Sequence, residues 1–383
     1  MVALLVLMLA ACTLWTVLGF FAVARVTRGR RTPREVAGHA PARGVSVLKP
    51  LCGADAGLAQ NLESFFVQSH ASYELVFGVQ RADDPAVRVV EALQARYPGV
   101  SSKLVVHSGC GGRNPKVDNL RGMLPFATHD LLLISDSNVR VPDTYLSEMV
   151  ATLQSGERPA GLVTNLFAGV GENCLGAALE NVQLNGFCAA GSALPTLAGD
   201  AAVIGKSMLF SKKSFERLGG FARVADVLAE DFVIGKMFQH GGHEVRIAPT
   251  VLSNVTSNMT PKAFYDRHLR WAMLRSRLRP TAYVLEPLTS PLALLPAALF
   301  VLGPAGVLWA LGLLLLRDVG QWVLLRGARR AYLPLVLGPL REVAMLVVWV
   351  AAPLKRHVTW RGTRVRLGAG TLLFDRATSP GVA

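Results

Sequence analysis

The chain has 383 residues, of which 51% are hydrophobic and 17% are charged, and 40 Lys and Arg stand against 26 Asp and Glu, a formal charge of +14. Soluble domains usually carry about 25% charged residues, so this composition excludes a disordered protein and argues against a simple cytosolic enzyme. The positive charge suits nucleic acid, anionic lipid or a phosphate-bearing substrate. Its position along the chain decides among these partners.

Segment 1–26 is predicted to be a transmembrane helix. No charged residue occurs before Arg25, and this length crosses about 30 Å of hydrocarbon as a helix. Five arginines follow between residues 25 and 34, most of them in a basic linker, 27–43, and the positive-inside rule places that linker in the cytoplasm. The residues before Cys12 look like a lipoprotein cleavage site, but no positive region precedes them and the apolar run continues beyond it.

Residues 283–356 are predicted to form two or three further membrane helices, followed by a basic tail, 357–383. The apolar block 287–325 is long enough for a tight hairpin of two spans, with Gly303-Pro304 as the interruption.

The segment 332–354 carries Arg341 and Glu342 in its middle. A central charged pair costs roughly 5–7 kcal/mol on insertion, and the Leu and Val residues return roughly 3–7 kcal/mol. Two interpretations follow: the segment spans the membrane with its charged pair turned towards neighbouring helices, or it lies at the interface.

Residues 44–282 are predicted to form a cytoplasmic α/β domain. Short apolar runs alternate with segments of helical periodicity, a pattern typical of βαβ units around a mainly parallel sheet. Ligands bind at the carboxyl ends of the strands in such sheets, so polar residues directly after apolar runs are the candidates. The five cysteines contain no CxxC pair, which indicates neither a zinc site nor a disulfide framework.

Each of three acidic motifs has both a functional and a structural interpretation. Asp84 precedes a proline at a predicted helix start, where it caps the helix or binds a ligand. Asp136 directly follows the apolar run 131–135, where it forms a turn or holds Mg²⁺ or Mn²⁺ beside a nucleotide diphosphate. Asp231 opens a helical stretch, 232–240, and the helix dipole alone favours an acid there.

Two basic motifs have the same ambiguity. Arg267, Arg270 and Trp271 lie in an arginine-rich helical stretch that either rests on anionic lipid or clamps a diphosphate through the fixed donors of arginine. The glycine-rich loop 109–115 lacks the Walker and dinucleotide spacings. Lys116, at its end, is either a phosphate contact at a helix start or simply the close of a flexible turn.

In chain order, Asp84, Asp136, Asp231 and the Arg-x-x-Arg-Trp motif at 267–271 resemble the D, D, D, (Q/R)xxRW signature of the ceramide glucosyltransferase family of membrane glycosyltransferases. The segments 45–51, 61–66, 83–86, 114–120, 142–144, 341–342 and 359–364 are also similar to that family. The resemblance covers almost the whole chain, and bacterial enzymes that glycosylate hopanoid lipids share much of it.

The resemblance implies a GT-A fold, an inverting transfer and a UDP-sugar donor. Asp84 would contact the uridine, Asp136 would hold a divalent cation, Mg²⁺ or Mn²⁺, and Asp231 would be the general base. The predicted donor-binding side chains are Asp84, Lys116, Arg267, Arg270 and Trp271.

The implied reaction moves a hexose, glucose in the first instance, to the hydroxyl of a membrane lipid such as ceramide at the cytoplasmic face of the cell membrane. The alternatives are transfer of N-acetylglucosamine or another sugar to a hopanoid, and a processive polysaccharide synthase, which usually has more spanning helices. Eukaryotic ceramide enzymes carry a histidine in the stretch matching 185–202, where this sequence has none, so the acceptor stays open. Nucleic acid is disfavoured as a partner because most of the excess arginine lies beside apolar segments.

Overall fold

The computed structural model describes the chain except for residues 30–42, 56, 201, 328–331, 361–362 and 375–383. The described residues form two compact units. One, called here the sheet unit, comprises 26–167 and 198–255, and the other, the helical unit, comprises 1–25, 168–197 and 256–383. The segments 168–197 and 256–282, which belong to the predicted domain 44–282, therefore group with the apolar helices.

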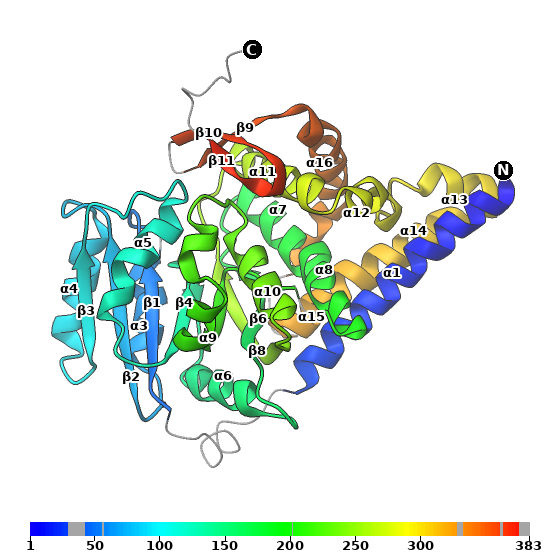
Figure 1. Ribbon diagram of the computed structural model, residues 1–383. Helices are drawn as coiled ribbons and strands as arrows, with labels where there is room; N and C mark the ends of the chain where they lie inside the picture. Colours follow the sequence, from blue (N-terminus) through cyan, green and yellow to red (C-terminus); the bar gives the residue numbers. More distant parts are fainter. Residues whose placement is uncertain (30–42, 56, 201, 328–331, 361–362, 375–383) are drawn as a thin grey trace. The chain divides into compact units, whose positions relative to one another are not determined.

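The sheet unit is built on eight strands in the order β3-β2-β1-β4-β7-β6-β8-β5 (Figure 1). The strands are β1 (Val45–Pro50), β2 (Tyr73–Val79), β3 (Ser102–Val106), β4 (Leu131–Ser135), β5 (Val139–Arg140), β6 (Leu162–Val170), β7 (Ser207–Ser211) and β8 (Val245–Val255). The first four in this order are parallel, whereas β7 runs antiparallel to both β4 and β6. Every residue of β1 and β4 is buried, as expected for strands covered on both faces.

Helices flank this sheet, which confirms the predicted α/β class. They are α3 (Leu58–Phe66), α4 (Ala86–Arg96), α5 (Pro115–Met123), α6 (Tyr145–Gln154), α9 (Lys212–Arg217) and α10 (Glu230–His240), with short 3₁₀ turns at Leu124–Phe126 and Gly220–Val224. Apolar side chains from α5 and α10, such as Leu120 and Phe238, pack with strand residues such as Leu132 and Phe210 in one buried core. This core fixes the starts of α5 and α10 relative to the end of β4.

The helical unit contains residues 2–25 of α1 (Val2–Arg28) and all the remaining helices. These are α7 (Leu175–Gln183), α8 (Ala189–Ala193), α11 (Pro261–Leu278), α12 (Pro280–Leu285), α13 (Leu295–Leu302), α14 (Ala305–Leu314), α15 (Gln321–Arg326) and α16 (Gly338–Ala351). Two π-helical turns connect helices of this unit: η2 (Leu184–Cys188) joins α7 to α8, and η6 (Leu315–Gly320) joins α14 to α15. The 3₁₀ turns lie at Leu194–Ala198, Glu286–Thr289 (η5), Leu333–Leu337, Ala352–Leu354 and Ala369–Thr371. A small antiparallel sheet consists of β9 (His357–Trp360), β10 (Thr363–Leu367) and β11 (Leu373–Phe374).

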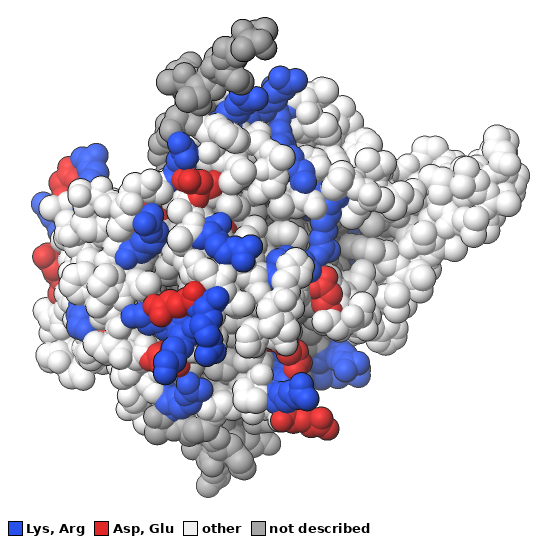
Figure 2. Space-filling view, viewed as in Figure 1, with Lys and Arg blue, Asp and Glu red and all other residues white. Residues whose placement is uncertain are grey.

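Within the described residues, three helical stretches are long and apolar enough to cross a membrane: Val2–Arg28, Ala305–Arg326 and Leu333–Leu354. This confirms one N-terminal and two C-terminal candidates. The predicted hairpin over 287–325 has one short arm, because the eight residues of α13 extend only about 12 Å. Helices α1, α13 and α14 lie side by side (Figure 1), and their visible face carries no charged side chain (Figure 2).

The charged pair of the third stretch points inward. Arg341 and Glu342 are only 1% and 3% exposed, and their partners come from other helices of the same unit. This agrees with the interpretation in which the pair turns towards neighbouring helices.

Candidate active site

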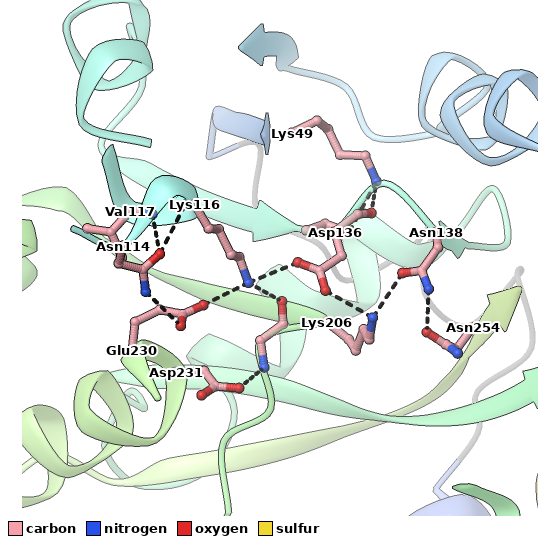
Figure 3. Close-up of polar contacts among 12 residues, drawn as sticks. Lys49, Asn114, Lys116, Val117, Asp136, Asn138, Lys206, Glu230, Asp231 and Asn254 are labelled. Atoms are coloured by element: carbon pink, nitrogen blue, oxygen red, sulfur yellow. Dashed lines mark hydrogen bonds and ion pairs between the residues drawn. The ribbon is translucent and has the colours of Figure 1, made fainter. Parts of the chain in front are cut away.

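Asp136 lies directly after β4, at the carboxyl end of the parallel strands, and is held by two lysines (Figure 3). Lys116 Nζ lies 2.9 Å from its Oδ1 and Lys206 Nζ lies 3.0 Å from its Oδ2. Lys206 reaches this position because β7 pairs with β4 in a register that sets Ser207 opposite Ser135. Both carboxylate oxygens are therefore engaged by ammonium groups of the protein itself.

The start of α5 positions Lys116. Asn114 is the N-cap residue, and its Oδ1 accepts hydrogen bonds from the backbone N–H groups of Lys116 and Val117, both at 3.0 Å. Pro115 follows in the first turn, where its missing N–H costs nothing and its fixed φ favours the helix. The lysine side chain is thereby aimed at Asp136 from a rigid helix start.

The charges of this network reinforce one another. Burial opposes ionisation of Asp136, but the ammonium groups of Lys116 and Lys206 outweigh it and hold the pKa of the carboxyl well below its usual range. Burial likewise opposes the charge on Lys116, yet Asp136 and Glu230 raise the pKa of this lysine above its usual value. Asp136 and Lys116 are thus a charged pair at neutral pH.

A third lysine, Lys49, supports the same turn. Lys49, on β1, is completely buried and donates to the backbone carbonyl of Asp136 at 2.8 Å. Its Nζ also lies 3.7 Å from the centroid of the Phe65 ring. Because burial dominates there, the pKa of Lys49 is lowered well below its usual value. Lys49 thus fixes the turn that presents Asp136.

Lys116 also connects Asp136 to the acidic start of α10. Its Nζ lies 3.0 Å from Glu230 Oε1 and donates to the Gly205 carbonyl at 3.2 Å. The Gly205 N–H in turn donates to Asp231 Oδ2 at 2.6 Å. Three predicted site residues, Lys116, Asp136 and Asp231, therefore meet in one network (Figure 3).

Position 205 of this network leaves little room for a side chain. A Cβ atom there would lie 2.8 Å from Lys116 Nζ and 3.1 Å from Asp231 Oδ2. The missing side chain allows the backbone to pass between the lysine and the carboxylate.

Glu230 is more deeply buried than its neighbour Asp231. It is 6% exposed and accepts a hydrogen bond from Asn114 Nδ2 at 3.2 Å. Burial is the largest influence and raises the pKa of Glu230, with Asp231 acting in the same direction and Lys116 against it. Glu230 is therefore a buried partner of Lys116, while Asp231 is the more accessible carboxylate.

Asp84 hydrogen-bonds the first turn of α4, whose N-cap residue is Pro85. Its Oδ1 accepts from the Ala86 N–H at 2.9 Å, and both of its carboxylate oxygens lie 3.0 Å from the Gly53 N–H. The carboxylate thus ties the loop after β1 to the first turn of α4. A contact with uridine stays a prediction.

The glycine-rich loop folds around an acid. Asp118 Oδ1 accepts from the backbone N–H groups of Cys110 and Gly112, both at 2.8 Å, and Gly109 and Gly111 adopt positive φ. Two of the loop's amides are therefore already occupied. A contact between Lys116 and phosphate stays a prediction.

The Arg-x-x-Arg-Trp motif belongs to the helical unit, on α11. Arg267 Nη1 lies 2.9 Å from Glu180 Oε1, and His268 Nε2 lies 2.8 Å from Glu180 Oε2. Trp271 stacks edge-on against His268 with 5.3 Å between the ring centroids, and Arg270 is partly exposed. Glu180, on α7, thus fixes the first residue of the motif.

Glu180 is fully buried. Burial opposes its charge, but His268 and Arg267 outweigh it and hold the pKa of Glu180 at about 2, against a usual value of 4.5.

We expect Glu180→Gln to destabilise the helical unit by about 3 kcal/mol, because breaking a buried ion pair leaves a charge without its partner. Because the folded-state pKa is depressed, this stabilisation is present above pH 4.5 and is lost as the pH falls towards about 2. Thermal unfolding of both proteins in detergent across this range measures the effect. The exposed Glu216→Gln is the control, and equal midpoints for all three proteins at pH 7 would contradict the assignment.

Sequence reasoning missed several residues of these networks, among them Lys49, Glu180, Gly205, Lys206 and Glu230. Glu230 adjoins Asp231 in the same acidic motif, so its position was a usable signal. Lys206 stands alone before a strand, and only the pairing of β7 with β4 brings it to Asp136.

Comparison with known proteins places these features in a family. The family model described as glycosyl transferase family 21 matches residues 2–373. Ceramide glucosyltransferase 3 of Caenorhabditis elegans is 29% identical over 343 residues, which is 85% of this chain and 73% of the relative. Ceramide glucosyltransferase 1 of the same organism is 28% identical over 338 residues, 85% of this chain and 72% of the relative. These matches confirm the family resemblance.

Among solved structures, a mannosyltransferase from Pyrobaculum calidifontis superposes with a TM-score of 0.50 at 17% identity, covering 92% of this chain and 98% of that one. This likeness concerns the fold, and it confirms the predicted GT-A type.

Proposed function

Because the chain belongs to glycosyl transferase family 21, we propose that it transfers glucose from a UDP-sugar to the hydroxyl of a membrane lipid, ceramide in the first instance, with inversion at the anomeric carbon. The names of the two C. elegans relatives support this donor sugar and acceptor. The observation that carries the proposal is Lys116, which joins Asp136 to the acidic start of α10 at the strand ends.

In the proposed reaction Asp231 is the base. The lipid hydroxyl oxygen attacks the anomeric carbon, the bond from that carbon to the diphosphate breaks, and the hydroxyl proton passes to Asp231. The Gly205 N–H holds one carboxylate oxygen of Asp231 in place, and a positioned base typically contributes 10²- to 10⁴-fold. Glu230 is less suited to this role, because it is buried against Lys116.

Lys116 and Lys206 are the proposed diphosphate ligands of the sheet unit. Each now pairs with Asp136, and a diphosphate offers them oxygens of greater charge. Preorganised cations beside the leaving group stabilise the negative charge that gathers there. In the helical unit, Arg267 and Arg270 are proposed to contact the diphosphate and Trp271 the boundary between sugar and lipid.

A divalent cation fits the residues at the end of β4. Asp136 and Asn138 offer carboxylate and amide oxygens, the hard donors that Mg²⁺ and Mn²⁺ prefer, and Lys206 Nζ already contacts both residues. The described residues contain no group of three His, Cys, Asp or Glu that could hold a metal, so donor phosphates would supply further ligands. A bound cation would neutralise charge on the diphosphate. The P. calidifontis mannosyltransferase is described in complex with GDP-mannose and Mn²⁺.

The three apolar helices indicate a membrane protein. We assign residues 44–282 to catalysis and place them on the cytoplasmic side, because arginines follow α1 directly. Anchoring then brings a soluble donor to an insoluble acceptor, which is a gain in proximity.

Membranes from a host that expresses the chain, supplied with UDP-glucose, Mn²⁺ and ceramide, test the proposal. Mass spectrometry is expected to find a ceramide carrying one hexose. A matched reaction with UDP-N-acetylglucosamine and a hopanoid tests the alternative pair. Polymeric product would indicate a synthase, and no lipid product from any pair would overturn the proposal.

Lys206→Met is expected to weaken binding of UDP to the purified protein about tenfold or more, because a hydrogen bond to a charged group contributes about 1.5–3 kcal/mol. Calorimetric titration with UDP measures the change. Lys213→Met, at an exposed position on α9, is the matched control. Equal affinities for the two variants would remove Lys206 from the donor site.

A further inference from the structure

A recess lies within the helical unit, between α16, η5 and the junction of α7 with η2. Its empty volume, including the open mouth, is about 370 Å³. The polar part of the lining consists of Gln183, Glu286, Ser290, Arg317, Arg341 and Glu342. The remaining wall is mostly apolar and includes Phe187, Leu346 and Trp349. The recess therefore joins a charged end to an apolar wall, and its residues Arg317 and 341–349 belong to two of the stretches that are candidates to cross the membrane.

The charged end is an ion cluster contributed by η6 and α16. Asp318 Oδ1 lies 2.8 Å from Arg317 Nε, and its Oδ2 lies 2.8 Å from Arg341 Nη2. Glu342 Oε1 lies 3.0 Å from Arg317 Nη2 and also contacts Arg341. Two arginines and two acids give no net charge. Gln183, on α7, accepts from Arg341 Nη1 at 3.3 Å.

Two π-helical turns meet at the cluster: η6 carries Arg317 and Asp318, and η2 packs against Asp318. A Cβ atom at Gly186 would lie 2.7 Å from Asp318 Oδ1, so only glycine lets η2 approach this acid. Single π-turns within helices occur frequently at functional sites.

The same cluster leaves hydrogen-bond donors unused. Arg317 Nη1 and Arg341 Nε are buried without a hydrogen-bond partner, although both residues line the recess and are at most 1% exposed. Buried polar groups are normally paired, and ionisable groups inside membrane segments commonly mark functional sites. Guanidinium N–H groups can only donate, so an acceptor atom of a bound molecule would satisfy them.

We infer that this recess binds the polar head of the acceptor lipid, through an uncharged oxygen such as an amide carbonyl, with the attached chain along Phe187, Leu346 and Trp349. An uncharged head follows from the balanced charge of the lining, where Glu286 and Glu342 stand beside Arg317 and Arg341 and would repel a phosphate. The inference rests on the proposed function, which supplies a lipid acceptor.

Helix α7 connects the recess to the signature motif within the same unit. Glu180 on α7 holds Arg267 and His268, and Gln183, one turn later, contacts Arg341 in the recess. The helix that positions the predicted diphosphate clamp thus also borders the recess.

Two neighbouring positions on α16 provide a matched test. Leu346 lines the recess, whereas Val347 is 53% exposed and lies outside it. With N-hexanoyl sphingosine as acceptor, Leu346→Trp is expected to raise the acceptor KM at least tenfold and leave the donor KM unchanged. Val347→Trp is expected to leave both unchanged. Equal acceptor KM values for the two variants would overturn the inference.

A crosslinking measurement on the unaltered protein covers the case in which Leu346→Trp does not fold. A ceramide with a diazirine in its acyl chain is expected to label the peptide around Leu346 and Trp349, and excess N-hexanoyl sphingosine is expected to suppress the label. Labelling confined to other helices would overturn the inference.

The two proposals can fail separately. If the peptide around Leu346 and Trp349 is labelled, N-hexanoyl sphingosine suppresses the label and no lipid is glycosylated, the lipid site stands and the proposed function is rejected. A reduced-amide analogue that lacks the carbonyl is expected to compete at least tenfold less well; equal competition would overturn the assignment of the two arginines to a carbonyl oxygen.

Discussion

Replacing Asp231 by Asn is expected to lower kcat for lipid glycosylation by about 10²- to 10⁴-fold, because the amide cannot accept the proton of the attacking hydroxyl. Asn keeps an oxygen that can accept the Gly205 N–H, a bond of 2.6 Å in the native protein. The loop and the lysine network are therefore expected to persist, and UDP-glucose should bind as before. Turnover with purified protein and titration with UDP-glucose separate the two effects.

Asp143→Asn is the matched control, because Asp143 is exposed in the same unit, at the entry to α6. This variant should retain full activity. Full turnover by Asp231→Asn would dismiss Asp231 as the base, and loss of UDP-glucose binding would mean that its carboxylate serves the fold of the site instead.

Asp136→Ala is expected to weaken Mn²⁺-dependent binding of UDP-glucose by at least about 100-fold. Losing a residue that merely supports a metal ligand costs 10- to 100-fold, and here the proposed ligand itself is removed. The variant also leaves Lys116 and Lys206 facing each other without the carboxylate that now joins them. Titration of donor with and without Mn²⁺ measures both consequences.

Asp130→Ala provides the comparison, since Asp130 immediately precedes β4 as Asp136 immediately follows it. Asp130 pairs with Arg43 at 3.3 Å, and both side chains are nearly half exposed, so its loss should cost at most about 1 kcal/mol. Unchanged metal-dependent binding in Asp136→Ala would rule out the proposed cation site.

The parallel half of the sheet was predictable because its strands are continuous apolar runs bounded by polar residues. The runs at 45–48 and 131–135 became β1 and β4. By contrast, β7 enters the sheet antiparallel between β4 and β6. That placement depends on a partner more than 70 residues away, and no local pattern carries such information.

The same distinction applies to the site. Asp136 and Asp231 stood out because each occurs where an apolar run or a helix changes to a polar turn. Lys206 and Glu180 did not, because a single charged residue in an otherwise ordinary segment gives no sign of its partner. The partner of Glu180, Arg267, lies 87 residues away in the sequence, and their pairing follows from the packing of α11 on α7.

The proposed reaction is a single displacement at the sugar, assisted by Asp231 as base. Proton NMR of the glycolipid product tests this most directly, because the donor carries glucose in α linkage and one displacement reverses that configuration. We expect a β-linked hexose on the lipid from the native chain and almost none from Asp231→Asn. An α-linked product would rule out a single displacement.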